Sequence, residues 1–266
     1  MRYGVLSDVH GNLPALEAVV AALGRERIDA WLCAGDLVGY GASPNECVDR
    51  LRALGVRSVA GNHDLVASGR QDESRCGRLA LETLRWTKRA LRDDVRAYLR
   101  ELPLHDEPAD GVVVAHGSLH DPWRYVARPA AAARELEALA GGRSAARLLV
   151  LGHTHAPLAY GADLGARDTG VPVELGATER WLLNPGAVGQ SREREPVARG
   201  LVLDLDADTA RFLAVEYDVE AALAALRRAG LPAAALHEPP AADAGPRRQL
   251  LRGRASGSGR RRGQAR

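Results

Sequence analysis

Five short polar motifs in this chain are rich in the residue types that bind divalent metals. They hold five of the eight histidines, three aspartates and one asparagine. The motifs are Asp8-Val9-His10, Gly35-Asp36, Gly61-Asn62-His63-Asp64, His116-Gly117 and Gly152-His153-Thr154-His155. Imidazole, carboxylate and amide groups together suit Mn, Fe, Zn, Co or Ni better than an all-oxygen calcium site. The set is large enough for two ions, so the sequence predicts a dinuclear metal centre.

Such a centre favours chemistry at phosphorus. Two ions about 3.5–4 Å apart can bind both the attacking and the leaving oxygen, and they lower the pKa of bound water. Asp36 is the best placed bridging ligand, because one carboxylate can contact two ions and Gly35 lets the backbone approach closely. His63 can then face the leaving group, with Asp64 orienting its ring. We therefore expect in-line hydrolysis of a phosphate ester by a metal-bridging hydroxide.

The elements around the motifs are predicted to bring them together. Each motif lies at the end of a short apolar run that reads as a strand: Tyr3–Leu6, Ala30–Ala34, Arg57–Ala60, Val112–Ala115 and Leu148–Leu151. Sites in open α/β sheets form beyond the carboxyl ends of the strands, so the motifs should meet at one edge. Helices are predicted over residues 13–23, 45–54, about 77–101 and 219–229. A second, more antiparallel set of strands is predicted at Trp181–Leu183, Leu201–Leu205 and Arg211–Glu216.

Composition divides the chain into two parts. Residues 1–232 are predicted to form one domain, and residues 233–266, rich in Pro, Ala, Gly, Ser and Arg, a disordered tail. The tail is strongly basic, although the formal net charge is only +2, so it could bind nucleic acid through phosphate contacts or simply remain solvated. No apolar run is long enough to span a membrane or to act as a signal peptide. The three cysteines lack metal-type spacing and are predicted to be free thiols in a reducing cytoplasm.

The order of the five motifs resembles that of the calcineurin-like metallophosphoesterase superfamily. The resemblance covers residues 3 to about 218. Residues 35–41, His116-Gly117-Ser118 and residues 184–190 are similar to a compact bacterial and archaeal, phosphodiesterase-like branch. The resemblance implies an α/β fold, a four-layer α/β/β/α sandwich with two mixed β-sheets, and two divalent metal ions, with Mn the expected metal.

Site residues follow from the resemblance position by position. One metal would be bound by Asp8, His10, Asp36 and His155, and the other by Asp36, Asn62, His116 and His153. His63 would contact the phosphoryl group together with Asn62 and protonate the leaving oxygen, with Asp64 behind it.

Two departures from the family pattern bear on the substrate. The Ser/Thr protein phosphatases of the superfamily have an arginine shortly after the G-D motif, and residues 37–41 contain none. In addition, Asp64 stands where many relatives have glutamate.

Arg124, next to Tyr125, is a candidate substrate-binding residue, since an arginine beside aromatic rings could pair with a phosphate and stack on a base.

We expect a phosphorylated small molecule or nucleotide as substrate, most simply a phosphodiester. Hydrolysis of diadenosine polyphosphates or of phosphoproteins is the alternative within the same mechanism. A metal-binding scaffold without activity is the alternative from another class, but all the ligand positions are filled here.

Overall fold

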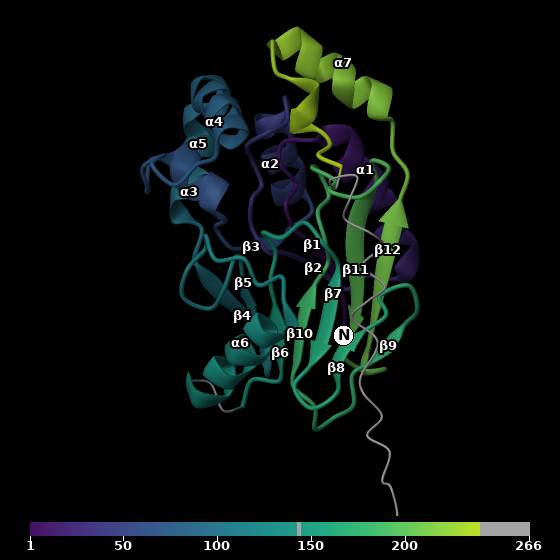
Figure 1. Ribbon diagram of the computed structural model, residues 1–266. Coiled ribbons are helices and arrows are strands. Elements are labelled where there is room, and N and C mark those ends of the chain that lie inside the picture. Colours follow the sequence, from purple (N-terminus) through teal and green to yellow (C-terminus); the bar gives the residue numbers. More distant parts are fainter. Residues whose placement is uncertain (143–144, 240–266) are drawn as a thin grey trace, which may run out of the picture.

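Two six-stranded mixed β-sheets form the centre of the molecule in the computed structural model, which describes residues 1–142 and 145–239 (Figure 1). In spatial order, the first sheet consists of β3 (Arg57–Ser58), β2 (Ala30–Cys33), β1 (Arg2–Leu6), β11 (Ala198–Asp204), β12 (Thr209–Val215) and β9 (Val173–Glu174). Strands β1, β2 and β3 are parallel, whereas β11 pairs antiparallel with both β1 and β12.

The second sheet has the same mixed character. In spatial order it consists of β4 (His105–Ala109), β5 (Val112–Ala115), β6 (Leu148–Val150), β10 (Trp181–Asn184), β7 (Leu158–Gly161) and β8 (Gly165–Arg167). Strands β5, β6 and β10 are parallel to one another, and β4 and β7 pair antiparallel at either side of them.

Apolar side chains from both sheets pack together between them. Val5, Leu32, Leu148 and Leu201 belong to this layer, and Trp181 is its largest fully buried side chain. The short apolar runs of the sequence are therefore strands whose two faces are both covered, one by the other sheet and one by helices.

Helices cover the outer faces of the two sheets. The α-helices are α1 (Leu13–Leu23), α2 (Pro44–Ala53), α3 (Asn62–Ser68), α4 (Arg78–Ala90), α5 (Asp93–Glu101), α6 (Pro129–Gly142) and α7 (Val219–Ala229). Short 3₁₀ turns follow α1 (η1, Gly24–Glu26) and α7 (η2, Ala233–Ala235). One apolar cluster joins α1, α2, α3, α4 and α5 to the first sheet, and another joins α6 to the second. The positions of these helices can be followed in Figure 1. This arrangement confirms the predicted four-layer α/β/β/α sandwich.

Two predictions about individual elements were wrong. The helical region 77–101 is two helices, because Leu91 and Arg92 have extended backbone and Asp93 and Asp94 begin a new first turn, where their charge is favourable. The predicted second set of strands is split: β10 belongs to the second sheet, but β11 and β12 belong to the first. Helices α3 and α6 were not predicted.

The end of the domain also lies further along the chain than predicted. Residues 233–239 are not a disordered tail: η2 packs against α7 and Tyr40, and residue His237 forms a bridge with Ser191. Ala235 and Leu236 are buried, which offsets the entropy of ordering this segment. Residues 240–266, with most of the predicted tail, lie outside the described residues.

Two further observations concern the described residues as a whole. No helix among them is both long enough and apolar enough to cross a bilayer. Cys33, Cys47 and Cys76 are free, as predicted.

Candidate metal centre

The five motifs meet at one edge of the paired sheets. Asp8 follows β1, Asp36 follows β2, and Asn62 begins α3 just after β3. His116 follows β5, and His153 follows β6. All five side chains are buried. The sequence prediction that the strand ends place these residues together is therefore confirmed, although the strands come from two sheets instead of one.

The loops that carry the motifs have unusual backbone geometry. Among the described residues, eight non-glycine residues have positive φ, and six of them lie at this edge: Asp8, His10, Asp36, Tyr40, His153 and His155. Left-handed backbone is unfavourable for residues with a Cβ and tends to occur at functional sites. The surrounding hydrogen bonds hold it here; for example, Asp8 N donates to Gly35 O at 2.9 Å.

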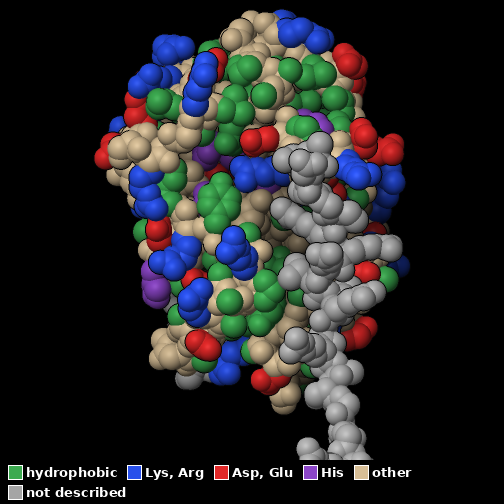
Figure 2. All heavy atoms as spheres, in the orientation of Figure 1, with side chains coloured by type: hydrophobic (Ala, Val, Ile, Leu, Met, Phe, Trp, Pro, Cys, Tyr) green, Lys and Arg blue, Asp and Glu red, His purple; other side chains and the backbone are tan. Residues whose placement is uncertain are grey.

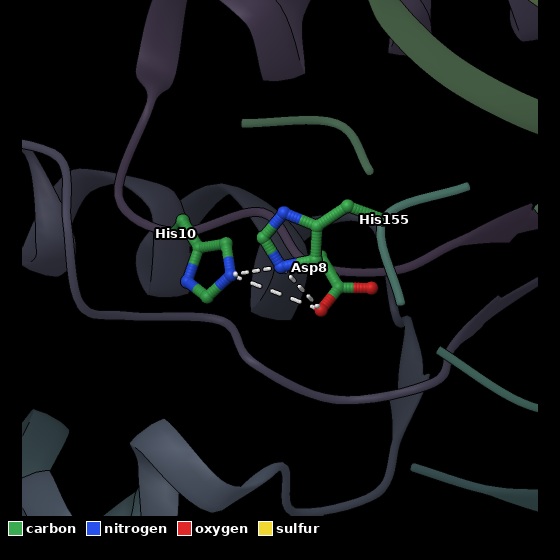
Figure 3. A group of neighbouring side chains, drawn as sticks. All are labelled: Asp8, His10 and His155. Carbon is green, nitrogen blue, oxygen red and sulfur yellow. Dashed lines mark hydrogen bonds and ion pairs between the residues drawn. The ribbon is translucent and has the colours of Figure 1, made fainter. Parts of the chain in front are cut away.

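A first cluster contains Asp8, His10 and His155 (Figure 3). The Nε2 atoms of the two histidines are 3.0 Å apart, and Asp8 Oδ1 lies 3.3 Å from that of His155 and 3.8 Å from that of His10. Asp8 and His10 come from the loop after β1 and His155 from the loop after β6, and the three side chains point toward one another.

A second cluster contains Asp36, His116 and His153, with Asn62 beside them. His116 Nε2 lies 3.3 Å from Asp36 Oδ2 and 3.1 Å from Asn62 Oδ1. The same Asp36 oxygen is 3.7 Å from Nε2 of His10, which belongs to the first cluster. Asp36 thus lies between the two clusters, as a bridging carboxylate must.

Backbone carbonyls fix the orientation of four histidine rings. The pairs are His10 Nδ1 with Val38 O (3.2 Å), His116 Nδ1 with Ala34 O (2.6 Å), His155 Nδ1 with Gln190 O (2.8 Å) and His153 Nε2 with Trp123 O (3.1 Å). A carbonyl can only accept, so each of these nitrogens carries a proton, and the other ring nitrogen presents its lone pair when the ring is neutral. Outer hydrogen bonds of this kind orient metal-ligating histidines.

The ring tautomers provide a test of whether metal ions fit the two clusters. His10 and His155 direct lone pairs at each other across 3.0 Å, with no proton between them in their neutral forms. His116 Nε2 likewise faces two oxygen acceptors. Such arrangements are repulsive unless a proton or a metal cation lies between the facing atoms. The side chains present therefore fit two divalent metal ions, and the clustered histidines and aspartates are candidate ligands.

The pKa values at the second cluster show that its buried groups favour a positive charge close to Asp36. Burial acts to lower the pKa of His116, but the adjacent Asp36 carboxylate outweighs it and raises the pKa to about 9. Burial lowers the pKa of His153 to about 3, and the charge on His116 contributes. Burial acts to raise the pKa of Asp36, yet His116 and His63 hold it well below its usual range. Without a metal, a proton on His116 thus balances the Asp36 charge.

His63 lies beside the two clusters and lines the cavity over them. Its backbone N–H donates to Asp36 Oδ1 at 2.8 Å, and its ring lies 4.8 Å from that of His10 and 4.7 Å from that of Tyr40. The Nδ1 atom is buried without a hydrogen-bond partner. It lies so close to Gly39 that a Cβ there would be 2.2 Å away, so the left-handed Gly39 is required for this ring position. The His63 ring is therefore held beside the candidate metal centre, and its Nδ1 atom is available to a ligand.

Asp64 does not orient His63, contrary to the sequence prediction. Its Oδ1 accepts from the backbone N–H groups of Leu37 (2.9 Å) and Val38 (3.2 Å), and its Oδ2 accepts from Gly61 N (3.0 Å). These bonds join the loop after β2 to the start of α3. Asp64 is thus a buried structural link between two ligand-bearing loops, and burial together with Asp36 raises its pKa to about 7.

A cavity of about 420 Å³ opens over the candidate centre. Its lining includes Asp36, Asn62, His63, His153 and His155. On the face shown in Figure 2, histidine atoms are visible in a hollow, beside arginine or lysine and acidic side chains. A volume of this size suits a small-molecule ligand.

The cavity corrects the prediction for Arg124. That residue is exposed and does not line the cavity. Arg75, Arg78 and Arg192 line it instead, with Tyr40, Trp123 and Tyr125. The local signal for Arg124 was its aromatic neighbours, but the side chain over the Tyr125 ring is Arg192, 5.9 Å from the ring centre. Arg192 lies two residues after the Gly-rich loop at residues 184–190, which was the available signal for it.

Comparison with known proteins identifies the class. Residues 1–208 match the family described as the calcineurin-like phosphoesterase superfamily domain, and the chain belongs to this family. A crystal structure of a metallophosphoesterase from Sphaerobacter thermophilus is 35% identical, with a TM-score of 0.77 and coverage of 89% of this chain and 96% of that one.

Two archaeal proteins extend the comparison. A protein from Methanocaldococcus jannaschii, named as uncharacterized, is 30% identical over 86% of this chain and 93% of its own length. A hypothetical protein from Pyrococcus horikoshii shares the fold at 22% identity, with a TM-score of 0.71 over 88% of this chain and 96% of that one.

Proposed function

We propose that this protein is a phosphodiesterase that depends on two divalent metal ions. The observation that carries the proposal is the position of Asp36 Oδ2, between His10 of one cluster (3.7 Å) and His116 of the other (3.3 Å). A single carboxylate oxygen shared by two buried sets of ligands is what two adjacent ions require.

The candidate ligands form two sets that share one member. Asp8, His10, Asp36 and His155 would hold one ion, and Asp36, Asn62, His116 and His153 the other. When bound, the ions would supply an attacking water of lowered pKa and neutralise charge on the phosphoryl oxygens. The mixed nitrogen and oxygen donors support Mn, with Fe, Zn, Co and Ni as other candidates.

The side chains around this centre position and protonate the substrate. His63 lies beside both Asp36 and the cavity, so its ring can donate a proton to the leaving oxygen. Asn62 lines the same cavity and can orient a phosphoryl oxygen through its amide group. The buried Asp64 keeps the two loops that carry Asp36 and His63 at a fixed separation.

A phosphodiester is the proposed substrate class, because residues 35–41 and 184–190 resemble the compact branch described above. The absence of arginine from residues 37–41 argues against a protein phosphatase. We place the protein in the cytoplasm, which three free cysteines among the described residues support.

The test uses metal-stripped protein reloaded with Mn. Hydrolysis of bis-p-nitrophenyl phosphate is compared with that of p-nitrophenyl phosphate, and bound metal is counted by mass spectrometry. We expect two ions per chain and preference for the diester. Asp36→Asn is the matched variant, and it should lower both metal content and turnover. Preference for the monoester would contradict the diester assignment, and two bound ions without hydrolysis of either ester would favour the scaffold alternative.

A further inference from the structure

Arg192 is a cationic side chain on the cavity wall that the proposed mechanism does not use. It follows β10 in the loop that leads to β11, and its side chain is 28% exposed. Its Nε is buried and has no hydrogen-bond partner. The nearest carboxylate is Glu238, whose Oε2 lies 3.9 Å from that nitrogen, beyond hydrogen-bond distance. A buried guanidinium N–H without an acceptor is costly, so this group is suited to an anionic ligand.

The structure ties Arg192 closely to the candidate metal ligands. Gln190, two residues earlier, accepts a hydrogen bond from the ring of His155. On the other side, the guanidinium lies over the Tyr125 ring, and that ring is 4.1 Å from the ring of the candidate ligand His153. The Tyr125 ring is therefore in contact with both Arg192 and the candidate ligand His153.

Neighbouring contacts decide which group faces the substrate. The Tyr125 ring lies between His153 and Arg192 and supports the guanidinium. Arg75, the other cavity arginine near these rings, is paired with Asp121 at 3.1 Å and lies over Trp123 at 5.1 Å. Of the two, Arg192 has the unsatisfied donor.

The last described segment of the chain brings an acidic group to the same place. Glu238 N donates to Ser191 O at 3.0 Å, and Ser191 N donates to Leu236 O at 3.3 Å. These backbone bonds place the Glu238 carboxylate in the cavity lining, opposite Arg192. Its side chain is 60% exposed, so it can move away when a stronger anion arrives.

We propose that Arg192 binds the non-bridging oxygens of the substrate phosphate, and that the Glu238 carboxylate competes with the substrate for this guanidinium. The inference rests on the proposed phosphoesterase function. It assigns to residue 192 the phosphate-binding role for which residues 37–41 contain no arginine. The planar guanidinium can donate two parallel hydrogen bonds to one phosphate.

The experiment compares three variants of the full chain reloaded with Mn: Arg192→Ala, Glu238→Gln and, as a control in the same loop, Arg194→Ala. Arg194 is exposed and does not line the cavity. Steady-state kinetics on bis-p-nitrophenyl phosphate give KM and kcat. Calorimetric titration with inorganic phosphate gives an affinity that does not depend on turnover, and metal counting confirms that the centre is intact.

The two informative variants should change affinity in opposite directions. We expect Arg192→Ala to raise KM and weaken phosphate binding by about 10- to 100-fold, the value of a charge-assisted hydrogen bond. We expect Glu238→Gln to lower KM and the dissociation constant for phosphate by about two- to fivefold, because exposed ion pairs are weak. Arg194→Ala should match the wild type.

Failure of the inference can be distinguished from failure of the proposed function. If the wild type hydrolyses the diester but Arg192→Ala changes neither constant at full metal content, Arg192 does not bind the substrate. If Arg192→Ala does not fold, an unchanged or weaker phosphate affinity in Glu238→Gln overturns the proposal. If no variant hydrolyses any ester, the proposed function fails, and the phosphate titration still tests the role of Arg192.

Discussion

Replacing Asp64 by Asn tests whether this buried carboxylate is a structural link or acts through His63. Asp64 accepts three backbone N–H groups, from Leu37, Val38 and Gly61. Asn has a single acceptor oxygen. If this oxygen keeps the bonds to residues 37 and 38, the side-chain NH₂ group faces Gly61 N–H, and two buried donors lose their acceptors. At about 1–3 kcal/mol for each unsatisfied donor, less the gain from removing a buried charge, we expect a loss of about 2–4 kcal/mol in the free energy of unfolding.

This loss should depend on pH in a defined direction. The pKa of Asp64 is raised to about 7 in the folded protein, above its ordinary value of 3.8. The stability that this group contributes is fully present below pH 3.8 and is lost as pH rises through about 7. Asn does not titrate. The difference between wild type and Asp64→Asn should therefore be larger at pH 5 than at pH 8.

Urea denaturation of the metal-free proteins, followed by circular dichroism, measures the difference at both pH values. An unchanged m-value with a lower midpoint would locate the effect in stability. His63→Ala is the comparison variant, since it should lower turnover with little effect on the denaturation midpoint. The reasoning is refuted if Asp64→Asn unfolds at the wild-type urea concentration while its kcat falls as far as that of His63→Ala, because Asp64 would then act through the His63 ring.

Three further predictions concern the centre and the chain end. His63→Ala should lower kcat by about 10²- to 10⁴-fold with metal content unchanged, since the substitution keeps the backbone N–H that donates to Asp36; mass spectrometry of the purified variant checks the metal. Metal binding must remove a proton from His116, whose pKa is raised to about 9, so Mn affinity should rise from pH 7 toward pH 9. Calorimetry in two buffers of different ionisation enthalpy would detect that proton, and equal heats would contradict it. Deleting residues 241–266 should leave turnover of an aryl diester unchanged, because the described residues up to 239 already form the cavity wall, and a large loss would assign the tail a role in catalysis.

Much of the candidate site could be predicted from the sequence because its signals are local. Asp8, Asp36 and His116 directly follow short apolar runs, and such runs form buried strands wherever both of their faces are covered. The end of each strand then places the next polar residue at the sheet edge. The order of the motifs also predicted the family, and the match of residues 1–208 to the family model confirms this prediction.

Hydrogen-bond partners could not be predicted in the same way. Asp64 lies next to His63 in the sequence, and their proximity favoured a pair. The backbone N–H groups of residues 37 and 38 reach Asp64 through the turn of the loop after β2, which begins at the left-handed Asp36. A buried carboxylate accepts hydrogen bonds from whichever N–H groups the folded loops place beside it. The identity of its neighbours in the sequence does not predict these donors.

The sequence by itself determined which residues can bind metal and at which strand ends they lie, because residue type and apolar pattern are local properties. Only the tertiary structure decided that β10 joins the second sheet while β11 joins the first, since strand partners are chosen by long-range packing. It also decided that Arg192, and not Arg124, lines the cavity. Arg192 reaches that wall because its loop binds His155 on one side and the segment around Glu238 on the other, contacts between residues far apart in the chain.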